Sequence, residues 1–332
     1  MDMEYITKNI SSYFKIFLFF EETKINKILK KLNIKTPKLI NDFRKTDEEI
    51  YNFINNDEYI ILVGLGKKRD INIDKLNNIF DNVKTFIKNF DNKLDKTVLF
   101  RLENKDNNFL LDQILCVSNI YYKFDKYKTD KKTKKSKSKK TKTKKNKKNI
   151  KIYIYTEKTN IKENKNINKL IDSINFVKDL GNEPANILNP DNYVKIIKER
   201  GKKSNFNVKI MDDKKMREMG MNLFLSVAEG SKYPGYLVEI NYNKINKKKE
   251  KKILIGKGIT FDSGGLSLKS SKYMDDMKTD MIGSATVLGI IDYLSQIKSS
   301  ENVIGLLAIA ENMIGSNATR PGDIIESYSG IN

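Results

Sequence analysis

Residues 251–269 read KKILIGKGITFDSGGLSLK, and this stretch is the most informative one for predicting the fold. It begins as an apolar run that predicts a buried strand and continues as a glycine-punctuated loop, which carries Lys257, Asp262 and Lys269. Loops at the carboxyl ends of strands line the ligand crevice of open α/β sheets, so these side chains are well placed to converge. A phosphate-binding P-loop is not indicated, because Lys257 is followed by Gly258 and not by Ser or Thr. Taken alone, such a loop is also a common connection between secondary-structure elements.

The next segment, residues 273–289, reads YMDDMKTDMIGSATVLG and predicts a long helix over 277–297. Asp280 falls near the start of that helix. A carboxylate there interacts favourably with the helix dipole, a role that Asp275 and Asp276 fit better. The periodic apolar positions expected to face the core are Met281, Ala285, Leu288, Ile291 and Leu294. The small residues that would permit close approach of the helix to a sheet are Gly283, Ala285 and Gly289.

Apolar runs and amphipathic stretches alternate on both sides of these segments, which is the order of an α/β protein. The C-terminal part is expected to form a mostly parallel or mixed sheet flanked by helices. Its strands are predicted at 207–210, 236–242, 252–255 and 303–309, and its other helices at 170–180, 193–200 and 213–219. In the N-terminal part, strands are predicted at 16–20, 59–63, 98–102 and 150–155, and helices at 25–32, 76–90 and 110–122.

The turn Gly64-Leu65-Gly66 follows the predicted strand at 59–63 and invites a dinucleotide-binding interpretation. We reject it, because Arg69 stands where the third glycine of that fingerprint is needed.

The chain contains no histidine, which excludes Ser-His-Asp and Cys-His catalysis and every histidine-based zinc site. Any metal must therefore be held by oxygen atoms or by an unusual nitrogen. The single cysteine, Cys116, cannot form an internal disulfide, and the acidic Asp2 and Glu4 do not fit a secretory signal. We expect a cytoplasmic protein without a membrane span.

The net charge of +21 comes largely from residues 131–151, which hold 13 lysines and no acid. Such a tract cannot bury apolar area, so we expect a solvated loop inserted at about 129–150. The alternative is a weak, salt-sensitive contact with nucleic acid. No aromatic residue interleaves the lysines, so base stacking is not indicated.

Several motifs taken together are more specific than any one alone. GKGITFDSGG, LK, MKTDM, AENM and RPGD follow one another in an order and spacing that resemble the leucyl aminopeptidase family of metallopeptidases. The resemblance runs from about Asp179, through NEPAN at 182–186 and Gly230-Ser231, to Gly330. It is looser in the N-terminal half, where VGLGKK and YKFDKYK carry it. It implies an N-terminal α/β domain over 1–165 and a metallo-aminopeptidase catalytic domain over 166–332.

The resemblance also implies roles for single residues. Lys257, Asp262 and Asp280 match metal ligands, and Asp262 would contribute to both ions of a pair. Lys269 matches the catalytic lysine, and Met277 matches a residue that lines the pocket for the first side chain of the substrate. All five would therefore contact the peptide substrate or its metals. The expected ions are two of Mn²⁺, Zn²⁺ or Mg²⁺, which would polarise the scissile carbonyl and activate a water molecule.

Family members continue after SYSG, here at 327–330, with an NTDAEGR motif that supplies two more carboxylate ligands and an arginine that holds bicarbonate. That motif is absent here. We therefore expect a C-terminally truncated relative with three of five metal ligands, inactive or weakly active by itself. A complete form would be a homohexamer that releases leucine-like N-terminal residues from peptides. The alternative is a non-catalytic relative that binds nucleic acid through its lysine-rich loop.

Overall fold

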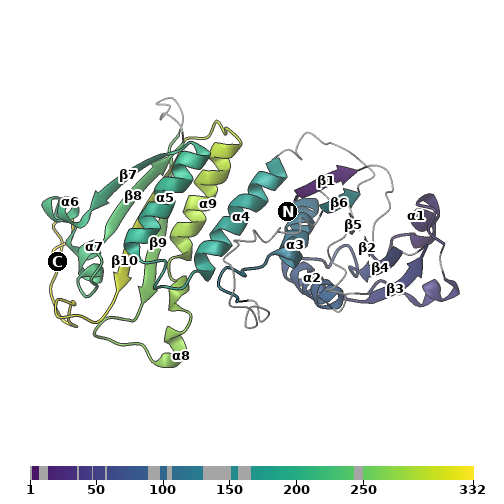
Figure 1. Cartoon of the computed structure of the whole chain (residues 1–332), viewed down its shortest axis with the longest axis horizontal. Coiled ribbons are helices and arrows are strands. Elements are labelled where there is room, and N and C mark those ends of the chain that lie inside the picture. The colour runs from purple at the N-terminus through teal and green to yellow at the C-terminus, as the bar shows by residue number, and fades with distance from the viewer. Residues whose placement is uncertain are drawn as a thin grey trace, which may run out of the picture. The chain divides into compact units, whose positions relative to one another are not determined.

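The computed structural model describes residues 2–6, 14–35, 37–46, 48–56, 58–88, 98–102, 107–129, 151–155, 166–242 and 250–332 (Figure 1). The chain divides into two compact units, Met1–Asn168 and Lys169–Asn332. The assignment of a role to each unit stays a prediction. The predicted lysine-rich insertion lies outside the described residues, apart from its first residue, Thr129. Within the ranges described, no helix is long and apolar enough to cross a membrane.

The N-terminal unit is built on a six-stranded sheet. In spatial order its strands are β1 (Asp2–Ile6), β6 (Lys151–Tyr155), β5 (Val98–Arg101), β2 (Phe14–Phe19), β4 (Glu58–Gly64) and β3 (Ile50–Asn55). All neighbours pair in parallel except β3, which is antiparallel to β4. The helical elements are α1 (Ile25–Lys31), the 3₁₀ helix η1 (Lys38–Asp42), α2 (Ile73–Lys88) and α3 (Asn107–Tyr121). Helix α2 buries one stripe of apolar residues at helical spacing: Leu76, Ile79, Phe80, Val83 and Ile87.

The C-terminal unit contains the predicted mixed sheet. Its strands, in spatial order, are β7 (Asn207–Asp212), β8 (Tyr236–Asn241), β10 (Val303–Asn312) and β9 (Lys252–Asp262). Only the β10–β9 pair is parallel. The helices are α4 (Ile167–Asn182), α5 (Pro190–Ser204), α6 (Asp213–Glu218), α7 (Asn222–Ala228), α8 (Ser271–Met274) and α9 (Ile282–Gln296), with the 3₁₀ turn η5 (Met277–Thr279). Helices α5 and α9 lie along the sheet and cover its core (Figure 1).

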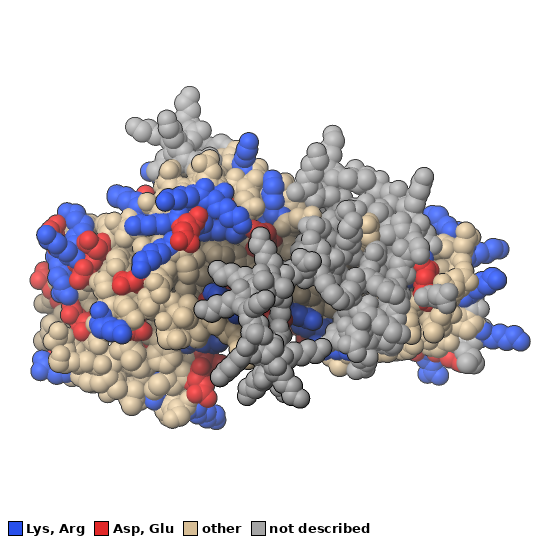
Figure 2. Space-filling view, in the orientation of Figure 1, with Lys and Arg blue, Asp and Glu red and all other residues tan. Residues whose placement is uncertain are grey.

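Basic side chains gather over α5 on the face seen in Figure 2, with acidic side chains among them. The exposed positions of this helix are Lys195, Lys198, Glu199, Lys202 and Lys203. The excess of positive charge is therefore not confined to residues 131–151.

Two predicted elements differ from the structure around the candidate site. Strand β9 continues to Asp262, whereas the glycines after position 255 predicted a loop. The helix predicted over 277–297 is interrupted, because the turn η5 ends at Thr279 and α9 begins only at Ile282. Asp280 therefore stands in the junction between two helical segments and not in the first turn of a long helix.

Glycine allows β9 and the start of α9 to lie in backbone contact. A Cβ atom on Gly256 would lie 2.5 Å from Cα of Ser284, and one on Gly283 would lie 3.2 Å from the backbone N and O of Lys257. Gly289 was expected to face the sheet, but it faces α4, where a Cβ atom would lie 2.4 Å from a methyl group of Val177. The small residues of α9 thus allow close packing against two elements, strand β9 and helix α4.

We expect Gly256→Ala to destabilise the C-terminal unit by about 1–3 kcal/mol, since the added methyl group meets backbone that cannot move aside easily. Gly181→Ala is the matched control, because its methyl group would meet only the flexible end of the Ile282 side chain. In helix α4 the alanine should also gain up to about 1 kcal/mol in helix propensity. Hydrogen exchange of the α9 amides measures both effects, and equal protection in the two variants would contradict the prediction.

A buried carboxylate joins the three long helices of the C-terminal unit. Asp292 of α9 is fully buried. It accepts two hydrogen bonds from Arg200 of α5, at 2.7 and 2.6 Å. Ser173 of α4 and Ser204 of α5 donate to it at 2.5 Å, and Gln296 donates at 2.9 Å. Burial alone would raise the pKa of Asp292, but these donors and the positive charge of Arg200 hold it below its ordinary value.

Candidate metal site

The five residues predicted from the sequence lie together beside β9. Lys257 and Asp262 come from the strand itself, Lys269 from the loop after it, and Met277 and Asp280 from η5 and its end. Two ion pairs connect them: Lys257 Nζ lies 3.0 Å from Asp280 Oδ2, and Lys269 Nζ lies 2.5 Å from Asp262 Oδ2. Lys269 also donates to the sulfur of Met277 at 2.9 Å. Side chains up to 23 positions apart in the sequence thus form two ion pairs, and their role as metal ligands and catalytic lysine stays a prediction.

Asp262 is the best-anchored member of the cluster. Its Oδ1 accepts hydrogen bonds from the backbone N–H of Gly264 at 2.9 Å and from the side-chain amide of Asn312 at 2.7 Å. Its Oδ2 accepts from Lys269. Partial burial acts to raise the pKa of Asp262, but these three hydrogen bonds outweigh it and lower the pKa below its ordinary value. The side chain is therefore an ionised carboxylate in a fixed orientation.

Asp280 leaves one oxygen atom unsatisfied. Its Oδ2 is buried, and although Lys257 Nζ is close, the geometry makes no hydrogen bond to that oxygen. The ammonium of Lys257 compensates the charge of this oxygen here, and a divalent cation would take that place in a metal-bound form. Among the described residues, no group of three His, Cys, Asp or Glu side chains could hold a metal ion. The available donor set is thus two carboxylates with Lys257, which suits a hard divalent cation once the lysine has lost its proton.

Asn312, at the end of β10, was missed by the sequence analysis. It belongs to the AENM motif, but the motif assigned no role to this residue. In the structure its side chain contacts Asp262 directly, and its carbonyl oxygen accepts from the N–H and the hydroxyl of Ser263, at 2.9 and 2.8 Å. No local pattern marks it, because the contact depends on the register between β9 and β10.

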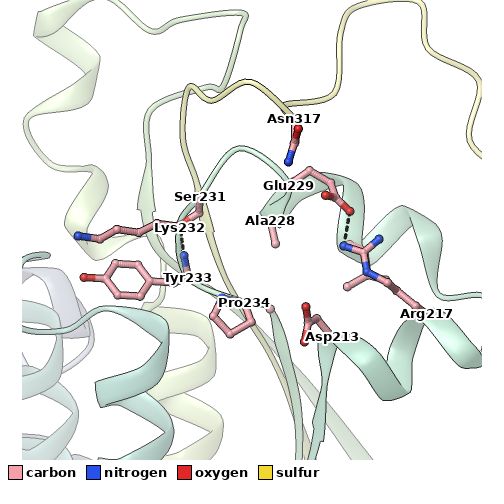
Figure 3. A pocket seen from close by; sticks show the side chains of 11 residues that line it. Asp213, Arg217, Ala228, Glu229, Ser231, Lys232, Tyr233, Pro234 and Asn317 are labelled. Atoms are coloured by element: carbon pink, nitrogen blue, oxygen red, sulfur yellow. Dashed lines mark hydrogen bonds and ion pairs between the residues drawn. The ribbon is translucent and has the colours of Figure 1, made fainter.

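A separate cavity of about 280 Å³ lies in the same unit (Figure 3). It is lined by α6, α7 and the loop at 229–235, with Asn317 on another side. Its wall carries an ion pair between Arg217 and Glu229 at 2.7 Å. None of the five predicted site residues lines this cavity. Met277 lies beside Lys269, and its role in lining a substrate pocket stays a prediction.

Comparison with known proteins identifies a family for the C-terminal part of the chain. The family described as "Cytosol aminopeptidase family, catalytic domain" matches residues 175–332. A probable cytosol aminopeptidase of Phytoplasma mali is 38% identical over 280 residues, covering 82% of this chain and 53% of the relative. One from Fusobacterium nucleatum is 36% identical, covering 81% and 52%. One from Azotobacter vinelandii is 45% identical over 162 residues, covering 48% of this chain and 33% of the relative. The chain spans about half the length of the first two relatives.

The fold is also found among solved structures. A bottromycin maturation enzyme, BotP, in complex with Mn, superposes with a TM-score of 0.74 at 20% identity, covering 96% of this chain and 64% of that one. Residues 175–332, which lie within the C-terminal unit, are thus similar to the catalytic domain of the cytosol aminopeptidase family. The chain belongs to the leucyl aminopeptidase family, whose relatives here are named probable cytosol aminopeptidases, and the resemblance predicted from the motifs is confirmed.

Proposed function

We propose that this chain supplies the metal site of a two-metal aminopeptidase that releases leucine-like N-terminal residues from peptides. The observation that carries the proposal is the convergence of Lys257, Asp262, Lys269, Met277 and Asp280 beside β9, with one buried carboxylate oxygen left without a donor. The names of the relatives support the reaction class. Mn²⁺ in the BotP complex supports a divalent ion, and we propose Mn²⁺, Zn²⁺ or Mg²⁺.

Lys257, Asp262 and Asp280 would hold the ions. Asp262 has the suitable ionisation and orientation, because its pKa is lowered and its Oδ1 is already fixed by two donors. Its Oδ2 would exchange the contact with Lys269 for a cation. Lys257 must lose a proton to donate its lone pair, so ion binding should release protons. When bound, a pair of divalent ions polarises a carbonyl group and lowers the pKa of a water molecule.

Lys269 is proposed to act on the substrate. It is a partly exposed cation held at the cluster by Asp262 and by the sulfur of Met277. A positive charge fixed at this point would stabilise the negative charge that develops on the scissile carbonyl oxygen. The thioether of Met277 places an apolar, adaptable surface next to that charge, which would favour a leucine-like side chain. The family resemblance further supports a cytoplasmic location and, in a complete form, a homohexamer with bicarbonate at the site.

We expect the 332-residue chain to bind Mn²⁺ weakly and to release leucine from leucine amide slowly or not at all. The reason is that Asp262 and Asp280 supply only two negative charges to two dications. Leucine release is measured with and without Mn²⁺, using Lys269→Ala as the variant and Lys272→Ala, an exposed lysine on α8, as its control. Release that requires Mn²⁺ and Lys269 but not Lys272 supports the proposal. Release that persists in Lys269→Ala comes from a contaminating peptidase, and a chain that binds no Mn²⁺ contradicts the proposal.

A further inference from the structure

We propose that Asn312 is a positioning residue for the metal ligand Asp262. The inference rests on the proposed function, and it assigns a role to a residue that no family motif explains. Its basis is an irregularity in the pairing of β9 with β10. Ala310 pairs with Ile259, yet Asn312 pairs with Asp262, so β9 contains one residue more than β10 between the two pairs. This is a β-bulge.

The bulge decides which side chain meets Asn312. In a regular parallel pair the partner of Asn312 would be Phe261, and Asp262 would point to the other face of the sheet, because successive side chains alternate. The extra residue moves Asp262 into register with Asn312. Thr260, inside the bulge, is buried and donates its hydroxyl to the carbonyl oxygen of Ala310 at 3.3 Å, which holds the irregular segment. Bulges often re-aim a side chain in this way next to active sites.

The amide of Asn312 then fixes one half of the carboxylate. Its nitrogen donates to Asp262 Oδ1 at 2.7 Å, alongside the N–H of Gly264. An ionised carboxylate only accepts hydrogen bonds, so the amide must present its nitrogen. The other end of the amide lies over Gly265, where a Cβ atom would be 2.9 Å from the oxygen of Asn312. With Oδ1 occupied by two donors, Oδ2 is the atom left to face Lys269 and an incoming cation.

The side chain can be removed without disturbing the loop that follows Asp262. Ser263 is tied to the main-chain oxygen of Asn312, through both its N–H and its hydroxyl. Those contacts survive any substitution of the side chain. A variant at position 312 therefore tests the amide contact to Asp262 separately from the backbone frame of the loop.

The test is Mn²⁺ affinity of the full chain, measured by isothermal titration calorimetry. The variants are Asn312→Ala and Asn312→Leu, the second of which keeps the branched shape of the side chain and removes both its donor and its acceptor. Asn241→Ala is the matched control, an asparagine on β8 of the same sheet whose partner is the exposed Asn207. We expect both Asn312 variants to weaken Mn²⁺ binding by about 10 to 100-fold, the usual cost of losing a partner of a metal ligand. The control should stay within about 2-fold of the unsubstituted chain, as expected for a surface site away from the ligands.

A purely structural role for Asn312 gives a different result. It would lower the melting temperature in the presence of a chelator and leave the Mn²⁺ affinity of the folded protein unchanged, and that result overturns the inference. Unchanged affinity in Asn312→Leu alone also overturns it, because the donor would then be dispensable. If the unsubstituted chain binds no Mn²⁺, the proposed function fails and the inference fails with it. If it binds Mn²⁺ and the variants bind equally well, only the inference fails.

Discussion

Replacing Asp262 by asparagine is expected to weaken Mn²⁺ binding by more than about 100-fold, beyond the range typical for a residue that only supports a ligand. The substitution preserves size and removes the negative charge. In the structure the carboxylate of Asp262 is ionised, because the hydrogen bonds that it accepts lower its pKa despite partial burial. It is also the carboxylate proposed to contact both ions, so its loss should affect the whole site and not one ion alone.

Asp280→Asn should show a similarly large loss for a different reason. Its buried Oδ2 has no hydrogen-bond donor, so an amide at this position would leave a neutral group where a cation is needed. Asp275→Asn is the matched control, since Asp275 is exposed and lies five residues earlier in the same segment. Metal content after dialysis, measured by mass spectrometry, decides the question. Unchanged stoichiometry in both Asp262→Asn and Asp280→Asn would remove them from the ligand set.

The largest effect on stability is expected at Asp292. Replacing it with alanine leaves the guanidinium of Arg200 buried without its carboxylate, and breaking a buried ion pair in this way costs about 3–5 kcal/mol. Arg200 would keep its contact with Asp172, at 2.7 Å, and its position over the ring of Phe176, at 4.4 Å from the centroid. Asp172 is half exposed, so it cannot replace the lost partner fully. Hydrogen exchange of α4, α5 and α9 measures the loss within this unit.

The double variant Arg200→Met with Asp292→Leu separates charge from packing. If the cost comes from an unpaired charge, the double variant should be markedly more stable than Asp292→Ala. An equal loss in both would mean that the packing of the three helices, and not the uncompensated charge, decides the stability.

The ion pair between Arg200 and Asp292 also makes the stability of the folded protein depend on pH, and the direction of that dependence can be stated. The pKa of Asp292 is lower in the folded protein than its ordinary value of about 3.9, so the folded state favours the ionised form. Its contribution to stability is therefore complete above that ordinary value and is lost as the pH falls through the folded pKa. Asp292→Ala should lack this part of the acid transition.

Much of the fold could be predicted from the sequence, because the residues that are buried form apolar runs in strands and recur at helical spacing in helices. Strands β2 and β4 are continuous apolar runs that the sheet buries, and α2 shows its core stripe at helical spacing. Strand β3 was not predicted, since it is a partly exposed edge strand in which Asn52 and Asn55 interrupt the apolar residues. The length of β9 was underestimated because Gly256 and Gly258 indicate a loop when they are read in isolation. In the structure, Gly256 is a strand glycine that makes room for α9.

The candidate site was predicted from motif order and not from local physics. Lys257, Asp262 and Asp280 were identified because their spacing resembles that of a family, and each alone had an ordinary structural explanation. Asn312 could not be identified in this way. Its partner depends on a one-residue bulge, and the amino-acid sequences of β9 and β10 do not indicate which residue is the extra one.

The backbone contact between β9 and the start of α9 has a consequence for the motion of the site. Lys257 belongs to the strand and Asp280 to the segment that leads into the helix, and Gly256, Gly283 and Ser284 bring these two backbones together without intervening side chains. Close-packed interiors transmit displacement with little compression. Thermal fluctuations should therefore carry Lys257 and Asp280 in the same direction, so that the gap between their charged ends varies less than the position of either. Lys269 sits on a loop outside this contact, and its ammonium group is positioned by Asp262 and Met277 and not by the packing of β9 against α9.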